Sequence, residues 1–123
     1  TGYFCVNIVE FAAKDVMNVT SGGLPAGEDE FVKAGIEKAE CNLIPCSRVA
    51  NAPASLECRM TEIVTLKGET NYLVLGEVIG VHMREDCLVD GMFDVTRFQP
   101  LTRLGYRDYS VIKDVFSLAR PDD

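Results

Sequence analysis

Two long segments in the second half of the chain carry the clearest pattern of hydrophobic and polar positions. In LECRMTEIVTL (56–66), apolar and polar residues alternate over most of the length, which is the period of a half-buried strand. KGETN (67–71) has the composition of a hairpin turn, and residues 72–83 are apolar on both faces. Because strands with two apolar faces are typical of the centre of a sheet, we expect 72–83 to be a central strand covered on both sides.

Two glycines interrupt this returning strand, at Gly76 and Gly80. Their spacing of four residues places them on one face of a regular strand. Glycine in a strand relieves crowding where a sheet coils sharply, as it does in a small barrel. The pair therefore predicts a coiled sheet.

The first half of the chain mixes one strand with short helices. TGYFCVNIVEF (1–11) has the pattern of a strand buried on both sides, and residues 11–20 have near-helical apolar spacing. A second, shorter helix fits EDEFVKA (28–34), with Gly35 as its left-handed C-cap. The glycine-rich residues 21–29 and the proline-containing residues 44–55 are predicted to be irregular connections.

The last part of the chain is predicted to contain an Asp-Gly turn at 90–91 and a short helical or irregular piece at 94–101. Residues 103–121 begin as a Gly-Tyr loop and are expected to finish as a strand. The length of 123 residues fits a single domain spanning 1–123. Together the elements predict a β-rich α+β fold.

Composition and charge narrow the classes of partner. The chain is 47% hydrophobic and has a formal net charge of −7, and no basic cluster stands out in the sequence, so a nucleic acid is disfavoured as a partner. No run reaches the roughly 20 apolar residues of a membrane span, and the first residues lack a signal-peptide pattern. Five cysteines, odd in number and irregularly spaced, are typical of reduced thiols in a cytoplasmic protein.

Two residues are candidates for chemistry. His82, the only histidine, is either a general acid–base in a cleft or a residue at a strand end that is hydrogen-bonded or half-exposed, and the absence of a recognisable catalytic frame favours the second interpretation. Glu77 stands among apolar neighbours and needs a partner, for which Arg59 on the preceding strand is the candidate. The cysteine spacing does not fit paired zinc ligands, so no metal site is predicted.

Six segments cover nearly the whole chain in order: TGYFCVNIV, DVMNVTS, EDEFVKAGI, SRVANAPASLEC, LVLGEVIGVHM and PLTRLGYRDYSVIKDVFSLARP. This ordered set resembles the flavin reductase-like, FMN-binding split-barrel family, in the branch similar to flavoredoxin. The resemblance implies a split β-barrel of the FMN-binding type, with Thr1 where the family enters the middle of its barrel. The chain is similar to the C-terminal portion of a member, without the N-terminal strands and the part that binds the FMN phosphate. We expect a homodimer or another partner to replace those strands, because a half barrel leaves unpaired edges.

The resemblance also implies which residues approach the cofactor. Arg103, Leu104, Gly105 and Tyr106, together with Tyr109, match the loop that approaches the flavin or its dimer-related copy. Glycine permits close backbone approach, tyrosine stacks on a ring and arginine meets an anion, although both tyrosines also suit a core or an interface. Asn71 matches a position where related reductases carry a histidine near the nicotinamide. Because this chain has asparagine there, the resemblance favours a redox protein over NAD(P)H as the electron donor.

Three functions follow from these observations. The first is an FMN-dependent oxidoreductase that transfers hydride or electrons through bound FMN; its catalytic residues are not identified. The second is a non-catalytic flavin-binding or interaction module that keeps the split-barrel fold without a complete cofactor site. The third, a metal-dependent hydrolase that uses His82 and the cysteines, ranks below both.

Overall fold

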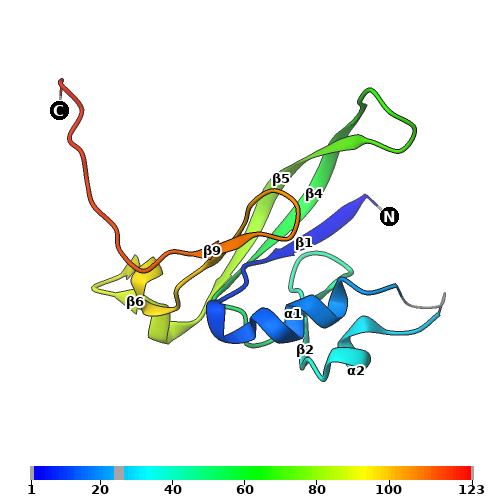
Figure 1. Cartoon of the computed structure of the whole chain (residues 1–123), viewed down its shortest axis with the longest axis horizontal. Coiled ribbons are helices and arrows are strands. Elements are labelled where there is room, and N and C mark those ends of the chain that lie inside the picture. Colours follow the sequence, from blue (N-terminus) through cyan, green and yellow to red (C-terminus); the bar gives the residue numbers. More distant parts are fainter. Residues whose placement is uncertain (1, 24–26, 123) are drawn as a thin grey trace.

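The computed structural model of the chain describes residues 2–23 and 27–122. Its centre is a three-stranded antiparallel sheet in the order β1-β4-β5, formed by Tyr3–Asn7, Ala54–Thr65 and Tyr72–Met83 (Figure 1). The long β4–β5 hairpin confirms the predicted strand, turn and returning strand in the second half of the chain.

Shorter elements surround this sheet. Three two-stranded sheets pair β2 (Lys38–Glu40) with β3 (Ser47–Val49), β6 (Leu88–Val89) with β7 (Met92–Phe93), and β8 (Leu101–Arg103) with β9 (Tyr109–Val111). The helical segments are η1 (Phe11–Ala13), α1 (Lys14–Thr20), α2 (Glu30–Ala34), η2 (Glu85–Cys87) and η3 (Val95–Arg97). The fold is therefore β-rich with few helices, as predicted.

The helix predictions for the first half are confirmed. The apolar spacing of 11–20 corresponds to η1 followed by α1. In α2, the Asp29 side chain caps the helix by accepting a 2.9 Å hydrogen bond from the Phe31 N–H, and Gly35 ends it with φ of 69°. The predicted connection over 21–29 includes residues 24–26, which lie outside the described residues.

Other boundaries differ from the predictions. The opening strand is shorter than 1–11 and half-buried in most positions, and the predicted irregular connection over 44–55 contains β3. The Asp90-Gly91 turn is confirmed, with φ of 51° and 78° at the two residues. The expected C-terminal strand ends at Val111, and the segment beyond it leads away from the sheet (Figure 1).

A β-bulge in β5 reverses the faces predicted for its second half. Glu57 pairs with Gly80 and Cys58 pairs with Val78, so the register skips Ile79. Each added residue flips the alternation of side chains beyond it. Gly76 therefore faces Phe4 whereas Gly80 faces Glu57, and the prediction that the two glycines share one face is wrong.

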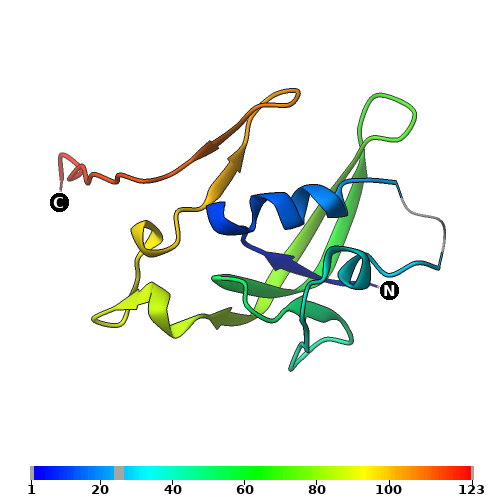
Figure 2. The same ribbon diagram turned by 60° about the horizontal axis from the view of Figure 1, so that its bottom comes forward.

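The prediction that β5 is central and covered twice is also wrong for the described residues. β5 forms an edge of the sheet, and its hairpin with β4 extends beyond the rest of the fold (Figures 1 and 2). Its exposed apolar side chains are those of Tyr72, Leu73, Val74, Leu75, Val78, Val81 and Met83. The small core lies around the start of β4 and includes Ile44, Ala54, Cys58, Cys87 and Phe98. The side chains of β5 are thus mostly apolar, yet many of them are exposed in the described residues.

Replacing Gly76 with alanine tests the close packing on the Phe4 face of β5. A Cβ at this position would lie 2.5 Å from the Phe4 Cζ atom and 3.2 Å from the Arg59 carbonyl oxygen. We expect Gly76→Ala to lower the free energy of unfolding by about 1–3 kcal/mol, because the ring or the backbone must move. Urea denaturation measures the change. Gly105→Ala is the matched control, since a Cβ there meets no atom within 4 Å; equal effects of the two variants would contradict the packing argument.

Candidate functional site

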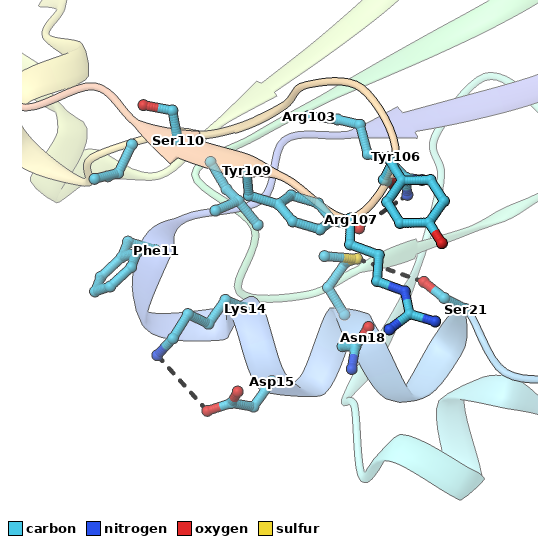
Figure 3. A pocket seen from close by; sticks show the side chains of 13 residues that line it. Phe11, Lys14, Asp15, Asn18, Ser21, Arg103, Tyr106, Arg107, Tyr109 and Ser110 are labelled. Carbon is cyan, nitrogen blue, oxygen red and sulfur yellow. Dashed lines mark hydrogen bonds and ion pairs between the residues drawn. The ribbon is translucent and has the colours of Figure 1, made fainter.

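A pocket of about 640 Å³ lies between α1 and the β8–β9 hairpin (Figure 3). Backbone hydrogen bonds bring these distant segments together, because the Phe11 N–H donates to the Gln99 carbonyl at 2.9 Å and the Leu101 N–H donates to the Val9 carbonyl at 2.9 Å. An isolated bridge between Glu10 and Pro100 lies between the two bonds. The start of the helical segment is thus fixed against the strand that carries one wall of the pocket.

Arg103, at the end of β8, organises the hairpin loop beside the pocket. Its Nη1 atom donates a 2.9 Å hydrogen bond to the Tyr109 hydroxyl, and its Nη2 atom donates a 3.0 Å bond to the Tyr106 carbonyl. The guanidinium carbon also lies 5.2 Å from the centre of the Tyr109 ring. Arg103 therefore holds both tyrosines in place.

Tyr106 has a strained backbone and an exposed side chain. Its φ is 62°, a left-handed conformation that costs a residue other than glycine about 1–2 kcal/mol. Two hydrogen bonds close the loop around it, from the Leu104 N–H to the Asp108 carbonyl at 2.9 Å and from the Asp108 N–H to the Gly105 carbonyl at 3.1 Å. The ring is 83% exposed and lies 5.5 Å from the Arg107 guanidinium carbon. Strain of this kind often accompanies a binding role.

The opposite wall, from α1, adds further charge and an aromatic face. Lys14 Nζ lies 4.5 Å from the centre of the Phe11 ring and 3.7 Å from the Asp15 carboxylate. The lining residues include three basic side chains, of Lys14, Arg103 and Arg107, against one acidic side chain, of Asp15. The pocket is therefore locally basic on a chain whose net charge is −7, and it favours an anionic ligand.

The structure brings together part of the set of cofactor residues expected from the resemblance. Arg103, Tyr106 and Tyr109 line the pocket, whereas Leu104 and Gly105 belong to the same loop without lining it. Asn71 lies in the β4–β5 turn, which is apart from this loop in both views of the fold, and its side-chain amide donates a 2.9 Å hydrogen bond to the Lys67 carbonyl (Figures 1 and 2).

Sequence reasoning missed the α1 wall and Arg107. Lys14 and Asn18 stand about 90 positions before the loop, and nothing in their spacing connects them to it. Arg107 lies next to Asp108 in the sequence, and sequence proximity does not show which side chains converge on the pocket. The positive charge of the pocket appears only when the two segments are packed together.

A second polar cluster is buried at the sheet. Glu57, only 1% exposed, accepts hydrogen bonds from the Asn42 N–H at 2.9 Å and the Leu43 N–H at 2.7 Å, and it pairs with His82 Nε2. Burial alone would raise the pKa of Glu57, but these bonds outweigh burial and lower the pKa to about 2. The interpretation of His82 as a hydrogen-bonded residue at a strand end is confirmed, with a side chain that is 20% exposed.

The predicted ion pair of Glu77 is also present. Its Oε1 atom lies 2.8 Å from Arg59 Nη2 across the β4–β5 pair, with both side chains about half exposed. Within residues 2–23 and 27–122, no group of three or more histidine, cysteine, aspartate or glutamate side chains is arranged to hold a metal ion. The described residues therefore offer no set of metal ligands for the metal-dependent hydrolase hypothesis.

The fold and the pocket can now be compared with known proteins. A family model described as "Flavin reductase like domain" matches residues 1–102. The chain belongs to this family. An uncharacterized protein of Deinococcus radiodurans is 37% identical to this flavin reductase like domain over 123 residues, which is 97% of the chain and 53% of that protein. The domain therefore spans about half the length of this relative.

Solved structures confirm the split-barrel fold for this flavin reductase like domain, whose sheets are not closed within the described residues. Nitrilotriacetate monooxygenase component B from Bacillus cereus matches with a TM-score of 0.86 and 26% identity, covering 95% of the chain and 60% of that protein. Flavoredoxin from Methanosarcina acetivorans matches with a TM-score of 0.78 and 22% identity, covering 98% and 63%. Among the described helices, none has the length and apolarity needed to cross a membrane.

Replacing Glu57 with glutamine tests the buried cluster. Because the folded-state pKa of Glu57 lies below its ordinary value of 4.5, its contribution to stability is present above pH 4.5 and is lost as the pH falls towards about 2. We expect Glu57→Gln to lower the melting temperature at pH 7 by at least about 5 °C and to flatten its decline below pH 4.5. Calorimetry at several pH values measures both effects.

Glu77→Gln is the control for this experiment, because it removes a carboxylate from an ion pair that is about half exposed to water. Exposed pairs contribute about 0–1 kcal/mol, so the melting temperature should change little. An equal loss in the two variants would show that the buried position of Glu57 carries no special stability.

Proposed function

We propose that this flavin reductase like domain binds FMN in the pocket between α1 and the β8–β9 hairpin, as part of a flavoprotein oxidoreductase. The family and the flavoredoxin neighbour support a flavin-related role. The observation that carries the proposal is the convergence of Tyr106 and Tyr109 with three basic side chains in one pocket. These residues come from two segments of the chain that lie about 90 positions apart in the sequence.

The chemical groups in the pocket fit the two parts of FMN. A planar ring system needs an aromatic face, which the exposed Tyr106 ring offers. FMN is also an anion, and Lys14 and Arg107 offer positive charge from opposite walls, whereas Arg103 is engaged with the tyrosines. FMN would supply hydride or electron transfer when bound; the protein would hold the ring and offset the negative charge of the cofactor.

The electron donor in this proposal is NAD(P)H or a redox protein. Asn71 bears on the choice, because its amide is used to close the β4–β5 turn and the turn lies apart from the pocket. This arrangement does not favour contact between Asn71 and a nicotinamide, and it therefore supports a redox protein over NAD(P)H as the electron donor. The cell compartment that suits such a reduced, thiol-containing protein is the cytoplasm.

The proposal includes a homodimer. β5 exposes apolar side chains on an unpaired edge, and a long apolar edge strand is a surface that another chain covers. The same surface supports the alternative function, a non-catalytic interaction module that keeps the fold without a working cofactor site. Binding of FMN separates the two functions, because only the first requires it.

Substitution of Tyr106 tests the FMN site. We expect Tyr106→Ala to weaken FMN binding about tenfold, since it removes the exposed aromatic face, and a tenfold change corresponds to about 1.4 kcal/mol. Quenching of FMN fluorescence on titration with protein measures the affinity. Tyr72→Ala is the matched control, because Tyr72 is an exposed tyrosine on β5 outside the pocket lining.

Two outcomes would count against the proposal. If the unaltered protein takes up no FMN, the oxidoreductase role fails and the interaction module is the better interpretation. If the protein binds FMN but both tyrosine variants bind it equally well, the flavin lies elsewhere in the molecule.

A further inference from the structure

Three cysteines from two separate segments lie around Glu57, apart from the flavin pocket. Cys5, on β1, is the cross-strand partner of Glu57, so the two side chains share a face of the sheet. The Glu57 carboxylate binds the backbone N–H groups of Asn42 and Leu43, and Cys41 directly precedes Asn42. The sheet position of Cys5 and the turn position of Cys41 are thus connected through one carboxylate.

The strand registers also place the segments that carry the two cysteines side by side. Asn7 shares the face of Cys5, and its Oδ1 atom accepts a 3.0 Å hydrogen bond from the Val49 N–H of β3. The β2–β3 register continues to Cys41 opposite Cys46, where the Cys41 N–H donates to the Cys46 carbonyl at 3.0 Å. Glu57, the partner of Cys5, binds the N–H groups of the β2–β3 turn, so β1 approaches this turn from Asn7 towards Cys5. The two thiols are close enough there for the Cys41 thiol to be one of the groups that raise the pKa of Cys5.

We infer that Cys5 and Cys41 form a reversible disulfide on oxidation by a small hydroperoxide. The Cys41 sulfur attacks one peroxide oxygen, which breaks the O–O bond and gives a sulfenic acid and an alcohol, or water when the oxidant is hydrogen peroxide. The Cys5 sulfur then attacks the Cys41 sulfur, and water leaves. The two thiols lose two electrons and two protons in total, and the disulfide joins β1 to the β2–β3 turn.

The surroundings assign different roles to the two sulfurs. Burial, with a smaller contribution from the neighbouring Cys41 thiol, raises the pKa of the Cys5 thiol to about 12, so Cys5 keeps its proton. The pKa of Cys41 is also raised, chiefly by burial, although the neighbouring Cys5 thiol and the charge of Arg48 lower it. In this inference Cys41 is the attacking sulfur and Cys5 the resolving one. The Glu57 charge disfavours both thiolates, which makes the first step slow and dependent on excess peroxide.

Exposure separates this cluster from the two other cysteines of the chain. Cys5, Cys41 and Cys46 are half-buried, so a small oxidant reaches them. Cys58 and Cys87 are buried, with 3% and 0% exposure. These two thiols serve as internal controls in the unaltered protein.

The test treats the whole folded chain with excess hydrogen peroxide, alkylates the remaining thiols, and identifies cross-linked peptides by mass spectrometry after proteolysis. We expect a peptide pair joined through Cys5 and Cys41, formed at least about tenfold faster than any loss of Cys58 or Cys87, and reversed by dithiothreitol. A Cys41–Cys46 bond, oxidation of all five cysteines at one rate, or oxidation to sulfinic acid without a cross-link would overturn the inference.

Matched variants sharpen the assignment. Cys46→Ser should still form the Cys5–Cys41 link, whereas Cys5→Ser should lose it and accumulate a sulfenic acid on Cys41 that a dimedone probe labels. Circular dichroism checks that each variant is folded. Since the cross-link in the unaltered protein is identified directly, a variant that fails to fold leaves the main result decisive.

Discussion

The buried carboxylate of Glu57 is the interaction on which the arrangement of the sheet and its neighbours depends. It satisfies two backbone N–H groups of the β2–β3 turn from β4 and pairs with His82 of β5, so one side chain connects three elements. Without it, those N–H groups would lose their hydrogen-bond partner, and a buried unpaired donor costs about 1–3 kcal/mol. The bulge at Ile79 is part of the same arrangement, since it turns Gly80 and His82 to the face of Glu57.

This dependence explains which parts of the fold could be predicted from the sequence. The β4–β5 hairpin and α2 follow from local pattern: alternation, a polar turn, an aspartate N-cap and a glycine C-cap. A bulge leaves no comparable local signal, and one added residue reverses every side chain beyond it. Gly80 was therefore assigned incorrectly to the face of Gly76, although the strand bounds were correct. Short pairs such as β2 and β3 were missed because three residues are too few to show a period.

The candidate site likewise has a part that the sequence identified and a part that only the fold reveals. The loop that carries Arg103, Tyr106 and Tyr109 is continuous in sequence, so the resemblance alone selected it. Lys14 lies beside this loop only because residues 9–11 hydrogen-bond to residues 99–101. A contact between segments so far apart in the sequence cannot be predicted from the spacing of residues. The chain is acidic as a whole, yet the pocket is basic, since net charge does not report how side chains are distributed in space. Asn71 shows the reverse case, a residue matched by resemblance that lies apart from the loop.

The apolar character of β5 exceeds what the described residues can bury, and this limits how a second chain can cover it. Arg59 and Glu77 form an ion pair within the same hairpin, with both side chains about half exposed. In water such a pair contributes about 0–1 kcal/mol, but complete burial would impose a desolvation cost on both charges. A covering surface must therefore either leave this pair at its wet rim or supply polar groups that complete its hydrogen bonds. Under the homodimer proposal, an interface centred on Val74, Val78 and Val81, which lie on the face of β5 opposite Glu77, leaves the charged pair in water and satisfies this requirement.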